Sequence, residues 1–408
     1  MTTTIDDIRA AAECLKGQVI RTPLVPAARM SEVLGCDLYL KLENLQRTGS
    51  FKDRGACVRL TKLDRKETER GVIAMSAGNH AQGVAYHARR LGIPATIVMP
   101  EFAPFSKVER TKSFGARVVL TGDTLDASAQ AARQIAEQEG LTFVHPYDDP
   151  DVIAGQGTIG LEILEDLPDV DTLVVPIGGG GLISGISLAV KDANPAAHMI
   201  GVETELYPSM SNALKGRGEL PGGSSLADGI AVKNPGKLTK DIIARLVEDI
   251  AIVPESAIET AIQRLVEEQK IVAEGAGAAG IAAILNDPER FAGRKVVTVI
   301  CGGNIDVRLL SGVLARGLLR DGRMVRLRIS IVDQPGVLAK IADTIGRSSA
   351  NIIEVYHQRL FYDVPAKRAD VDVVLETRNA DHVKEIIASL EQCGFPTRAL
   401  SAHSTVDA

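Results

Sequence analysis

The stretch VVPIGGGGLISG, residues 174–185, places four consecutive glycines, Gly178 to Gly181, between an apolar segment and a helix-like one. Without Cβ atoms the backbone can turn sharply there, and its N–H groups can converge on an anion at the start of a helix. A tight strand-to-helix turn is the simpler alternative. Four glycines cost conformational entropy that an ordinary turn does not require, so the loop favours phosphate binding. It does not match the dinucleotide-binding pattern G-x-G-x-x-G, whose last glycine would fall on Ile183 or Ser184.

The alternation of strand and helix continues through the first 320 residues. Helix-like stretches such as 106–115 and 125–140 separate short β-branched runs. Strands that alternate with helices predict βαβ units and a mostly parallel sheet, an α/β fold. In such sheets ligands gather at the carboxyl ends of the strands, so the loops there are where chemistry is expected. The predicted strands are residues 71–77, 95–100, 117–122, 172–180, 198–204 and 295–303.

The pattern changes after residue 320, where strands and helices follow in the order βαββαβ. This order predicts a single ferredoxin-like unit. We place the boundary at Asp321–Gly322, which gives a domain of residues 1–320 and a C-terminal domain of residues 326–408. Its predicted strands are 326–332, 350–358, 369–378 and 395–400, and its helices lie in 333–346 and 381–394.

The net charge of −6 offers no general attraction to nucleic acid or to anionic membranes. The apolar runs are short, and the N-terminus lacks a basic segment followed by an apolar one, so a cytoplasmic protein without membrane partners is expected. The five cysteines are scattered without CxxC spacing. Neither a disulfide framework nor a metal site is therefore predicted.

Two further motifs could carry chemistry. In ENLQRTGSFKDRGA (43–56), Lys52 lies between an aromatic ring and a charged pair, either as a solvated lysine or as a reactive amine. In SAGNHAQGVA (76–85), hydroxyl, amide, imidazole and backbone donors crowd together where a strand meets a helix, an arrangement that suits a carboxylate. Its candidate residues are Ser76, Gly78, Asn79 and His80.

A third glycine motif is EGAGAAG, residues 274–280, which matches G-x-G-x-x-G. It follows a stretch, 262–273, that is mostly helical in pattern, and no acidic residue lies about 20 positions further on. A nicotinamide-binding site, and with it a dehydrogenase, is therefore disfavoured. We expect close packing between two helices here, with Glu274 directed into the site.

Together these motifs resemble pyridoxal-phosphate enzymes of the tryptophan-synthase-β fold type, and among them threonine and serine dehydratases. The resemblance covers roughly residues 5–320 and includes HPYDDPDVIAGQGTIGLEI (145–163) and CGGN (301–304). It implies a two-lobed α/β fold with a small lobe at roughly 48–148, and pyridoxal 5′-phosphate as cofactor. The C-terminal part, with DQPGVLAKIA (333–342), resembles an ACT regulatory domain.

The resemblance also implies roles for single residues. Lys52 would bind the cofactor covalently and act as the catalytic base, and Cys301 would face the pyridine nitrogen. The implied cofactor-binding residues are Phe51, Lys52, Asn79, Gly178, Gly179, Gly180, Gly181, Leu182, Glu274 and Cys301. Those implied for the substrate carboxylate are Ser76, Gly78, Asn79 and His80.

The expected reaction is elimination from threonine, and from serine, to give 2-oxobutanoate or pyruvate and ammonia. Serine racemases carry a second serine where this chain has Ala77, and cysteine synthases carry threonine where it has His80, so both activities are disfavoured. A serine dehydratase or racemase and a non-enzymatic amino-acid sensor remain the alternatives. Some relatives bind a cation near 222–230, but only Asp228 is acidic there. A dimer or tetramer is expected, in isoleucine biosynthesis or in threonine catabolism. The first candidate effectors of the ACT-like domain are isoleucine and valine, followed by nucleotides, and a purely structural role in dimerisation is the alternative.

Overall fold

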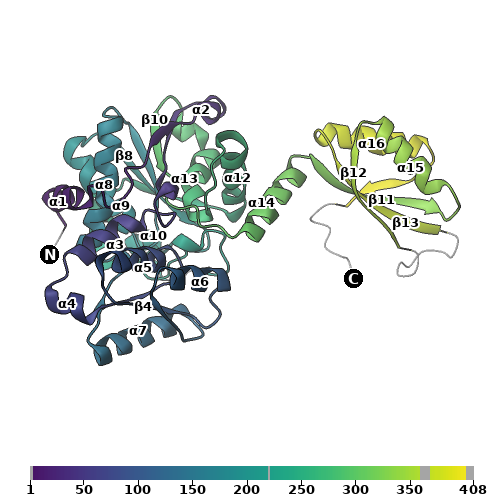
Figure 1. Cartoon of the computed structure of the whole chain (residues 1–408). Helices are drawn as coiled ribbons and strands as arrows, with labels where there is room; N and C mark the ends of the chain where they lie inside the picture. The colour runs from purple at the N-terminus through teal and green to yellow at the C-terminus, as the bar shows by residue number, and fades with distance from the viewer. Residues whose placement is uncertain (1–2, 219–220, 359–367, 401–408) are drawn as a thin grey trace. The chain divides into compact units, whose positions relative to one another are not determined.

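The computed structural model describes residues 3–218, 221–358 and 368–400. The chain divides into two compact units, Met1–Ile305 and Asp306–Ala408 (Figure 1). The second unit begins with helix α14 (Val307–Arg320), one helix before the boundary expected at Asp321–Gly322. Within the described ranges, no helix has the length and apolar character needed to cross a membrane.

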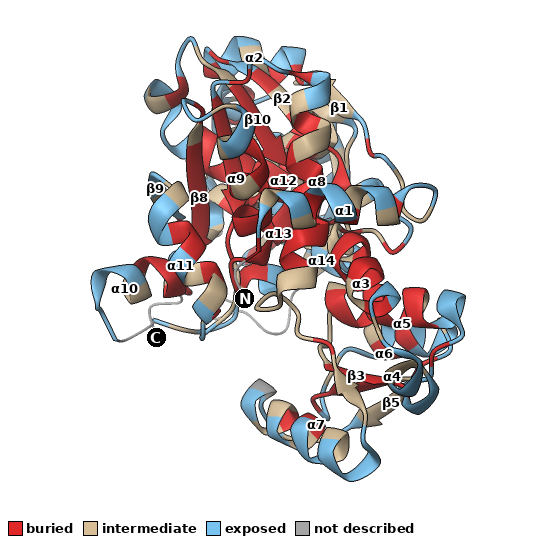
Figure 2. Cartoon of the chain, turned by 90° about the vertical axis from the view of Figure 1, so that its left-hand side faces the viewer, coloured by how far each residue is buried: buried red, intermediate tan, exposed pale blue. Residues whose placement is uncertain are grey.

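The larger sheet of the first unit has six strands in the order β1-β2-β10-β7-β8-β9. All neighbours are parallel except β1, which runs antiparallel to β2. Every residue of β7 is buried, and Figure 2 shows buried residues along β2, β8 and β10 as well. The strands are β1 (Leu24–Pro26), β2 (Asp37–Lys41), β7 (Thr172–Pro176), β8 (His198–Thr204), β9 (Asp249–Val253) and β10 (Lys295–Val299).

Helices cover this sheet. The sequence accounts for where some of these helices begin and end. Helix α8 begins at Pro150, and the Asp149 carboxylate accepts hydrogen bonds from the N–H groups of Asp151 and Val152. The stretch 262–273 is mostly helical, as predicted, and Lys270, which adopts φ +60°, ends the helical part after Gln269. The helices are α1 (Ile5–Leu15), α2 (Ala28–Leu34), α8 (Pro150–Asp166), α9 (Gly181–Ala193), α10 (Ser209–Lys215), α11 (Lys237–Leu246), α12 (Glu255–Arg264) and α13 (Gly275–Asn286), with short turns η1 (Glu43–Leu45), η2 (Asp228–Ile230), η3 (Leu265–Gln269) and η4 (Pro288–Phe291).

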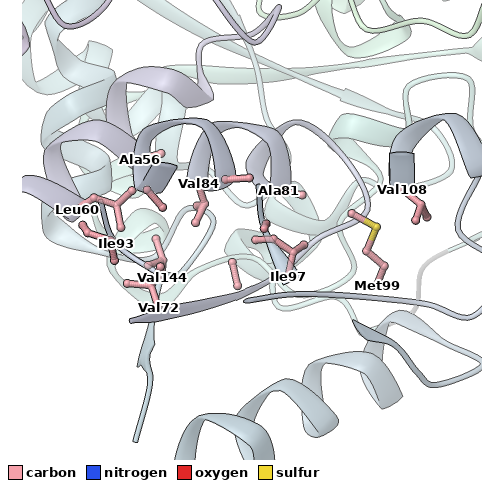
Figure 3. Packing of buried hydrophobic residues seen from close by; sticks show 14 residues of the cluster. Ala56, Leu60, Val72, Ala81, Val84, Ile93, Ile97, Met99, Val108 and Val144 are labelled. Carbon is pink, nitrogen blue, oxygen red and sulfur yellow. The ribbon is translucent and has the colours of Figure 1, made fainter. Parts of the chain in front are cut away.

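The smaller sheet of the first unit is entirely parallel, in the order β5-β4-β3-β6. On one face, Leu60 of α3 and Val84 of α5 pack with Val72 and Ile97 of the sheet (Figure 3). On the other face, Ala132 of α7 packs with sheet residues. The elements are α3 (Lys52–Thr61), α4 (Arg65–Arg70), β3 (Val72–Met75), α5 (Asn79–Leu91), β4 (Ala95–Met99), α6 (Phe105–Ser113), β5 (Arg117–Leu120), α7 (Leu125–Glu139) and β6 (Thr142–Phe143).

The second unit contains an antiparallel sheet in the order β12-β13-β11-β14. Alternate residues of β11, beginning with Leu327 and Ile329, are buried together with Ile341 of α15 and Ile386 of α16. The expected α/β fold and the βαββαβ order are both confirmed. The elements after α14 are β11 (Met324–Val332), α15 (Val337–Arg347), β12 (Asn351–Gln358), β13 (Arg368–Glu376), α16 (Ala380–Gln392) and β14 (Thr397–Ala399).

Candidate active site

Lys52 is the first residue of α3, and its loop lies against the loop that follows β10. The N–H of Phe51 donates to the carbonyl of Cys301 at 3.0 Å, and Ser50 forms an isolated bridge with Gly302. The Lys52 amine donates to the carbonyl oxygen of Pro146 at 2.6 Å and lies 5.0 Å from the centre of the Phe51 ring. The fold thus brings the lysine motif and the CGGN motif together.

The surroundings of Lys52 make its amine easier to deprotonate than that of an ordinary lysine. Burial lowers the pKa of Lys52 to about 8, while the nearby groups of Cys301 and Glu274 act in the opposite direction. The lower pKa raises the fraction of the amine that is neutral near pH 7, the form that acts as a nucleophile or a general base. This geometry supports a reactive amine over a solvated lysine.

The charged pair that follows Lys52 has structural partners. Asp53 accepts hydrogen bonds from the hydroxyl and the N–H of Thr48 at 2.6 and 3.0 Å, which closes the preceding loop. Arg54 is buried and forms ion pairs with Glu43 at 2.8 Å and with Glu162 at 2.6 Å. These contacts fix the backbone on both sides of Lys52. They therefore orient its side chain, but neither Asp53 nor Arg54 pairs with its amine.

The loop of residues 76–80 supplies donors at the start of α5. The Ser76 hydroxyl accepts a hydrogen bond from the N–H of Gly78 at 3.1 Å, and the Asn79 amide donates to Glu274 Oε1 at 2.6 Å. The Nε2 of His80 donates to the carbonyl of Val144 at 2.9 Å. Burial lowers the pKa of His80 to about 3, so its ring is neutral. The N–H groups of the first turn of α5 remain available to an anion.

Glu274 and Cys301 lie in the same buried region. Burial raises the pKa of Glu274 to about 7, and the charge of Asp228 adds to this effect. Burial also raises the pKa of the Cys301 thiol, which therefore stays protonated. A Cβ on Gly302 would lie 2.2 Å from Glu274 Oε1, so a larger residue there would displace the Glu274 carboxyl group.

The glycines of the EGAGAAG motif pack differently from the prediction. A Cβ on Gly277 would lie 2.4 Å from the carbonyl oxygen of Gly302, and one on Gly280 would lie 1.9 Å from the hydroxyl of Thr298 in β10. The expected packing between two helices is present between α12 and α13, but these two glycines face a loop and a strand. Helix α13 also lies against β7 and β10 of the larger sheet, and Glu274 at its start is directed into the site.

The loop of four glycines leads into α9 as expected. Gly180 has φ +96°, and α9 begins at Gly181, so the first N–H groups of this helix have no acceptor within it. A Cβ on Gly179 would lie 2.2 Å from the ring of Tyr147, and one on Gly180 would lie 2.8 Å from Thr239. Close packing therefore accounts for these two glycines, while the N–H groups of the first turn of α9 are the feature that suits a phosphate.

Several residues without an assigned role take part in the site. Asn304 donates to Asn79 Oδ1 at 2.7 Å and accepts from Arg110 of α6 at 2.8 Å. Pro146 and Tyr147 contact the lysine and the glycine loop, respectively. The sequence contained a signal for Pro146, Tyr147 and Asn304, because they lie in the motifs at 145–163 and 301–304. A cavity of about 610 Å³ lies beside Asn304. Most of the residues that line it, among them Arg110 and Lys270, were not predicted to belong to the site.

Asp228 forms an ion pair with Lys107 at 2.6 Å. In the part of the chain that the structure describes, no group of three or more His, Cys, Asp or Glu side chains is arranged to hold a metal ion.

Residues 15–302 match the family of pyridoxal-phosphate-dependent enzymes. The chain belongs to this family. Residues 321–394 match the ACT domain, so the chain also carries a C-terminal ACT domain.

Similar proteins were found by sequence and by structure. L-threonine ammonia-lyase of Thermotoga maritima is 49% identical over 397 residues, which cover 97% of this chain and 99% of that protein. The protein of the same name from Geobacter sulfurreducens is 47% identical over 95% of this chain and 97% of its own length. Maize serine racemase superposes with a TM-score of 0.73 at 34% identity, covering 78% of this chain and 99% of that one. Threonine deaminase isoform 2 of Solanum lycopersicum gives a TM-score of 0.71 at 35% identity, over 77% and 90% of the two chains.

Pyridoxal 5′-phosphate is the cofactor of this family, and the residues of the site fit it. A buried amine with a lowered pKa suits its aldehyde, and the start of α9 suits its phosphate. The thiol of Cys301 is buried near Lys52, and burial raises its pKa, which keeps it neutral. The hydroxyl of Ser50 is buried and has no hydrogen-bond partner among the described residues. Lys52, Asn79, Cys301 and the glycine loop are thus the groups that would hold the cofactor.

Proposed function

We propose that this chain is a threonine ammonia-lyase, which converts threonine to 2-oxobutanoate and ammonia and serine to pyruvate and ammonia. The observation that carries the proposal is the match to two proteins named L-threonine ammonia-lyase, which extends over nearly the whole of both partners. The Lys52 amine, the donor-rich loop of residues 76–80 and the N–H groups at the start of α9 support the same reaction class.

In this proposal the substrate carboxylate binds at the start of α5. The N–H groups of Asn79 and His80 point out of the helix, whose positive end favours an anion. The Ser76 hydroxyl accepts from Gly78 and keeps its own proton to donate to a carboxylate oxygen. Because the His80 ring already donates to Val144, its contribution comes from the backbone.

Bound pyridoxal phosphate would withdraw electrons from the substrate Cα and so make its proton easier to remove. Lys52 would take that proton, because its pKa of about 8 leaves part of the amine neutral near pH 7. Cys301 would lie beside the pyridine nitrogen as a neutral thiol, a much weaker partner than a carboxylate. A weak partner there favours loss of the β-hydroxyl.

We also infer that the ACT domain binds an amino-acid effector, for which isoleucine and valine are the first candidates. Gly336 has φ +85° at the start of α15, and no atom lies within 4 Å of the position that a Cβ would take. Open space beside free N–H groups at a helix start suits a carboxylate. A homo-oligomer in the cytoplasm remains our prediction for its state and location.

Serine racemisation is the second candidate, because a serine racemase is among the similar structures. Ala77 lies where racemases carry a serine, and its methyl group packs against the core of the smaller sheet. A proton donor for the opposite face of the substrate is thus missing at this position. Elimination is therefore favoured over racemisation.

The test of the proposal is the variant Lys52→Ala. We expect it to lose the absorbance of covalently bound cofactor and nearly all release of 2-oxobutanoate from threonine. It should fold, because Lys52 lies at a loop–helix junction and not in the hydrophobic core. Borohydride reduction of the unaltered enzyme followed by peptide mapping should find the cofactor on Lys52. Cofactor trapped on another lysine, or an unchanged absorbance in the variant, would contradict the assignment.

A further inference from the structure

A tight turn formed by His145, Pro146 and Tyr147 follows β6 in the first unit. The Nδ1 atom of His145 accepts hydrogen bonds from the N–H of Tyr147 at 3.3 Å and from the N–H of Asp148 at 2.8 Å. A backbone N–H can only donate, so Nδ1 carries no proton and the neutral ring is protonated at Nε2. The imidazole thus closes the turn in the way that an asparagine side chain closes an Asx turn.

The turn contacts Lys52 on one side. Pro146, at its centre, directs its carbonyl oxygen to the Lys52 amine at 2.6 Å. The proline ring restricts φ, and the imidazole holds the two N–H groups that follow, so the carbonyl has little freedom to rotate. No side chain in this contact is charged apart from the lysine itself.

The same turn contacts the glycine loop on the other side. The Tyr147 ring lies on Gly179, where a Cβ would come within 2.2 Å of it, and its hydroxyl donates to the carbonyl of Asn234 at 2.8 Å. Asp148 accepts from the first N–H groups of α11, and Thr239 of that helix donates to the carbonyl of Gly179 at 2.7 Å. One short turn therefore touches both the amine and the loop that leads into α9.

We propose that this turn is a positioning device that sets the Lys52 amine relative to the glycine loop, and that His145 is the residue that holds it in shape. The proposal rests on the assignment of Lys52 as the cofactor lysine. A cofactor joined to Lys52 and bound by its phosphate at α9 must span a defined distance, and small errors in such placements cost rate. His145 acts through Pro146 and Tyr147 and is therefore a positioning residue.

The ring of His145 suits this role. Burial lowers the pKa of His145, and the positive Lys52 adds to this effect while Asp148 opposes it. The ring therefore stays neutral, and Nδ1 remains an acceptor throughout the neutral range. The ring also meets that of Tyr147 edge-on, with centroids 4.7 Å apart, which holds the tyrosine on the glycine loop.

The variants His145→Asn and His145→Gln test the proposal. The oxygen of asparagine can take the place of Nδ1, whereas the longer glutamine reaches the place of Nε2. We expect His145→Asn to keep kcat for threonine within about threefold of the unaltered enzyme, and His145→Gln to lose about tenfold or more in kcat with little change in KM. The holoenzyme of His145→Gln should also lose cofactor faster on gel filtration, measured by absorbance.

The control is His198→Gln, since His198 lies half-exposed at the start of β8 with Glu248 as its partner, and it should change neither kcat nor cofactor retention. Thermal unfolding of each holoenzyme separates lost positioning from lost stability. Equal values of kcat and cofactor retention for the asparagine and glutamine variants, whether both are high or both are low, would overturn the proposal. Reduction of the unaltered enzyme tests the Lys52 assignment separately.

Discussion

At the scale of single residues, Lys52 lies beside charged neighbours that do not neutralise it. Asp53 accepts from Thr48, and Arg54 engages Glu43 and Glu162 in buried ion pairs. The acceptor left to the amine is the uncharged carbonyl of Pro146. Burial therefore dominates the pKa of Lys52 and lowers it, whereas a carboxylate in direct contact would have raised it.

Ala77 gives a prediction at this scale. Installing a hydroxyl with Ala77→Ser should raise racemisation of serine from a very low level, because it adds a proton donor at the position where racemases have one. Elimination should remain the faster reaction. Chiral chromatography of serine after incubation with each enzyme measures the change. If the unaltered enzyme already racemises serine as fast as it eliminates, the role given to Ala77 is wrong.

Glu274 gives a prediction about pH. Its pKa is about 7 in the folded chain and 4.5 ordinarily, so between these values the unfolded chain loses a proton that the folded chain keeps. The folded chain then binds more protons, and stability falls as pH rises from about 4.5 to about 7. Glu274→Gln cannot titrate and should flatten this decline in thermal midpoints measured from pH 5 to 8 with cofactor in constant excess.

The control for this measurement is Glu13→Gln, since Glu13 is exposed and paired with Lys16. It should leave the pH dependence of the midpoint unchanged. An identical decline in the Glu274→Gln variant and the unaltered enzyme would show that Glu274 does not carry the effect.

At the scale of elements, the placement of Lys52 depends on how closely helices approach α3. A Cβ on Gly55 of α3 would lie 2.9 Å from the carbonyl oxygen of Val152 in α8. A Cβ on Gly83 of α5 would lie 3.2 Å from the carbonyl carbon and oxygen of Lys52. Glycine at these two positions lets three helices meet backbone to backbone, and their contact determines where the amine lies.

Gly83→Ala tests this arrangement. The added methyl group should displace the start of α3 by a few tenths of an ångström, and we expect kcat for threonine to fall by about tenfold. Gly312→Ala in the middle of α14 is the matched control, because its Cβ would have only the Arg316 side chain near it, at 3.9 Å. It should stabilise its helix by about 0.5–1 kcal/mol and leave kcat unchanged. Equal kcat in both variants would contradict the role of Gly83.

At the scale of the whole molecule, the proposed catalytic residues and the proposed effector site lie in different units of the chain. The residues that fit the cofactor all lie in the first unit, and the ACT domain lies in the second. Threonine dehydratases of Staphylococcus aureus match this chain over 321 residues and 93% of their own length. The residues proposed for catalysis lie in the first unit, so the second unit is a candidate for control and not for catalysis.

Truncation after Arg320 tests this division. An effector must bind two states of the enzyme unequally to regulate it, so its signature is a change in threonine affinity or cooperativity. We expect isoleucine or valine to shift the threonine saturation curve of the full chain and to leave that of the truncated chain unchanged. Analytical ultracentrifugation of both chains controls for a change of assembly. Identical curves in all cases, at unchanged assembly, would leave the ACT domain a structural role.

The local pattern of the sequence determined the class of fold. Strand-length apolar runs that alternate with helical segments predicted the parallel sheets, and the βαββαβ order predicted the second unit, because both depend on neighbouring residues. The strands β1, β2, β6 and β9 were not among the predicted strands. Only β1 and β6, with three and two residues, are too short to carry a pattern; β2 and β9 are as long as predicted strands such as β7. The glycine loop, Lys52, Glu274 and Cys301 could be proposed for the site because each occupies a recognisable motif.

Only the tertiary structure decided how these motifs meet. The contacts of Lys52 with Pro146, of Arg54 with Glu162, and of Asn79 with Glu274 join residues 94, 108 and 195 positions apart. The role of the turn at His145 and the packing of α13 on β10 likewise depend on elements distant in the chain. Such contacts follow from how helices and sheets fill space against one another, and the pattern of neighbouring residues does not contain that information.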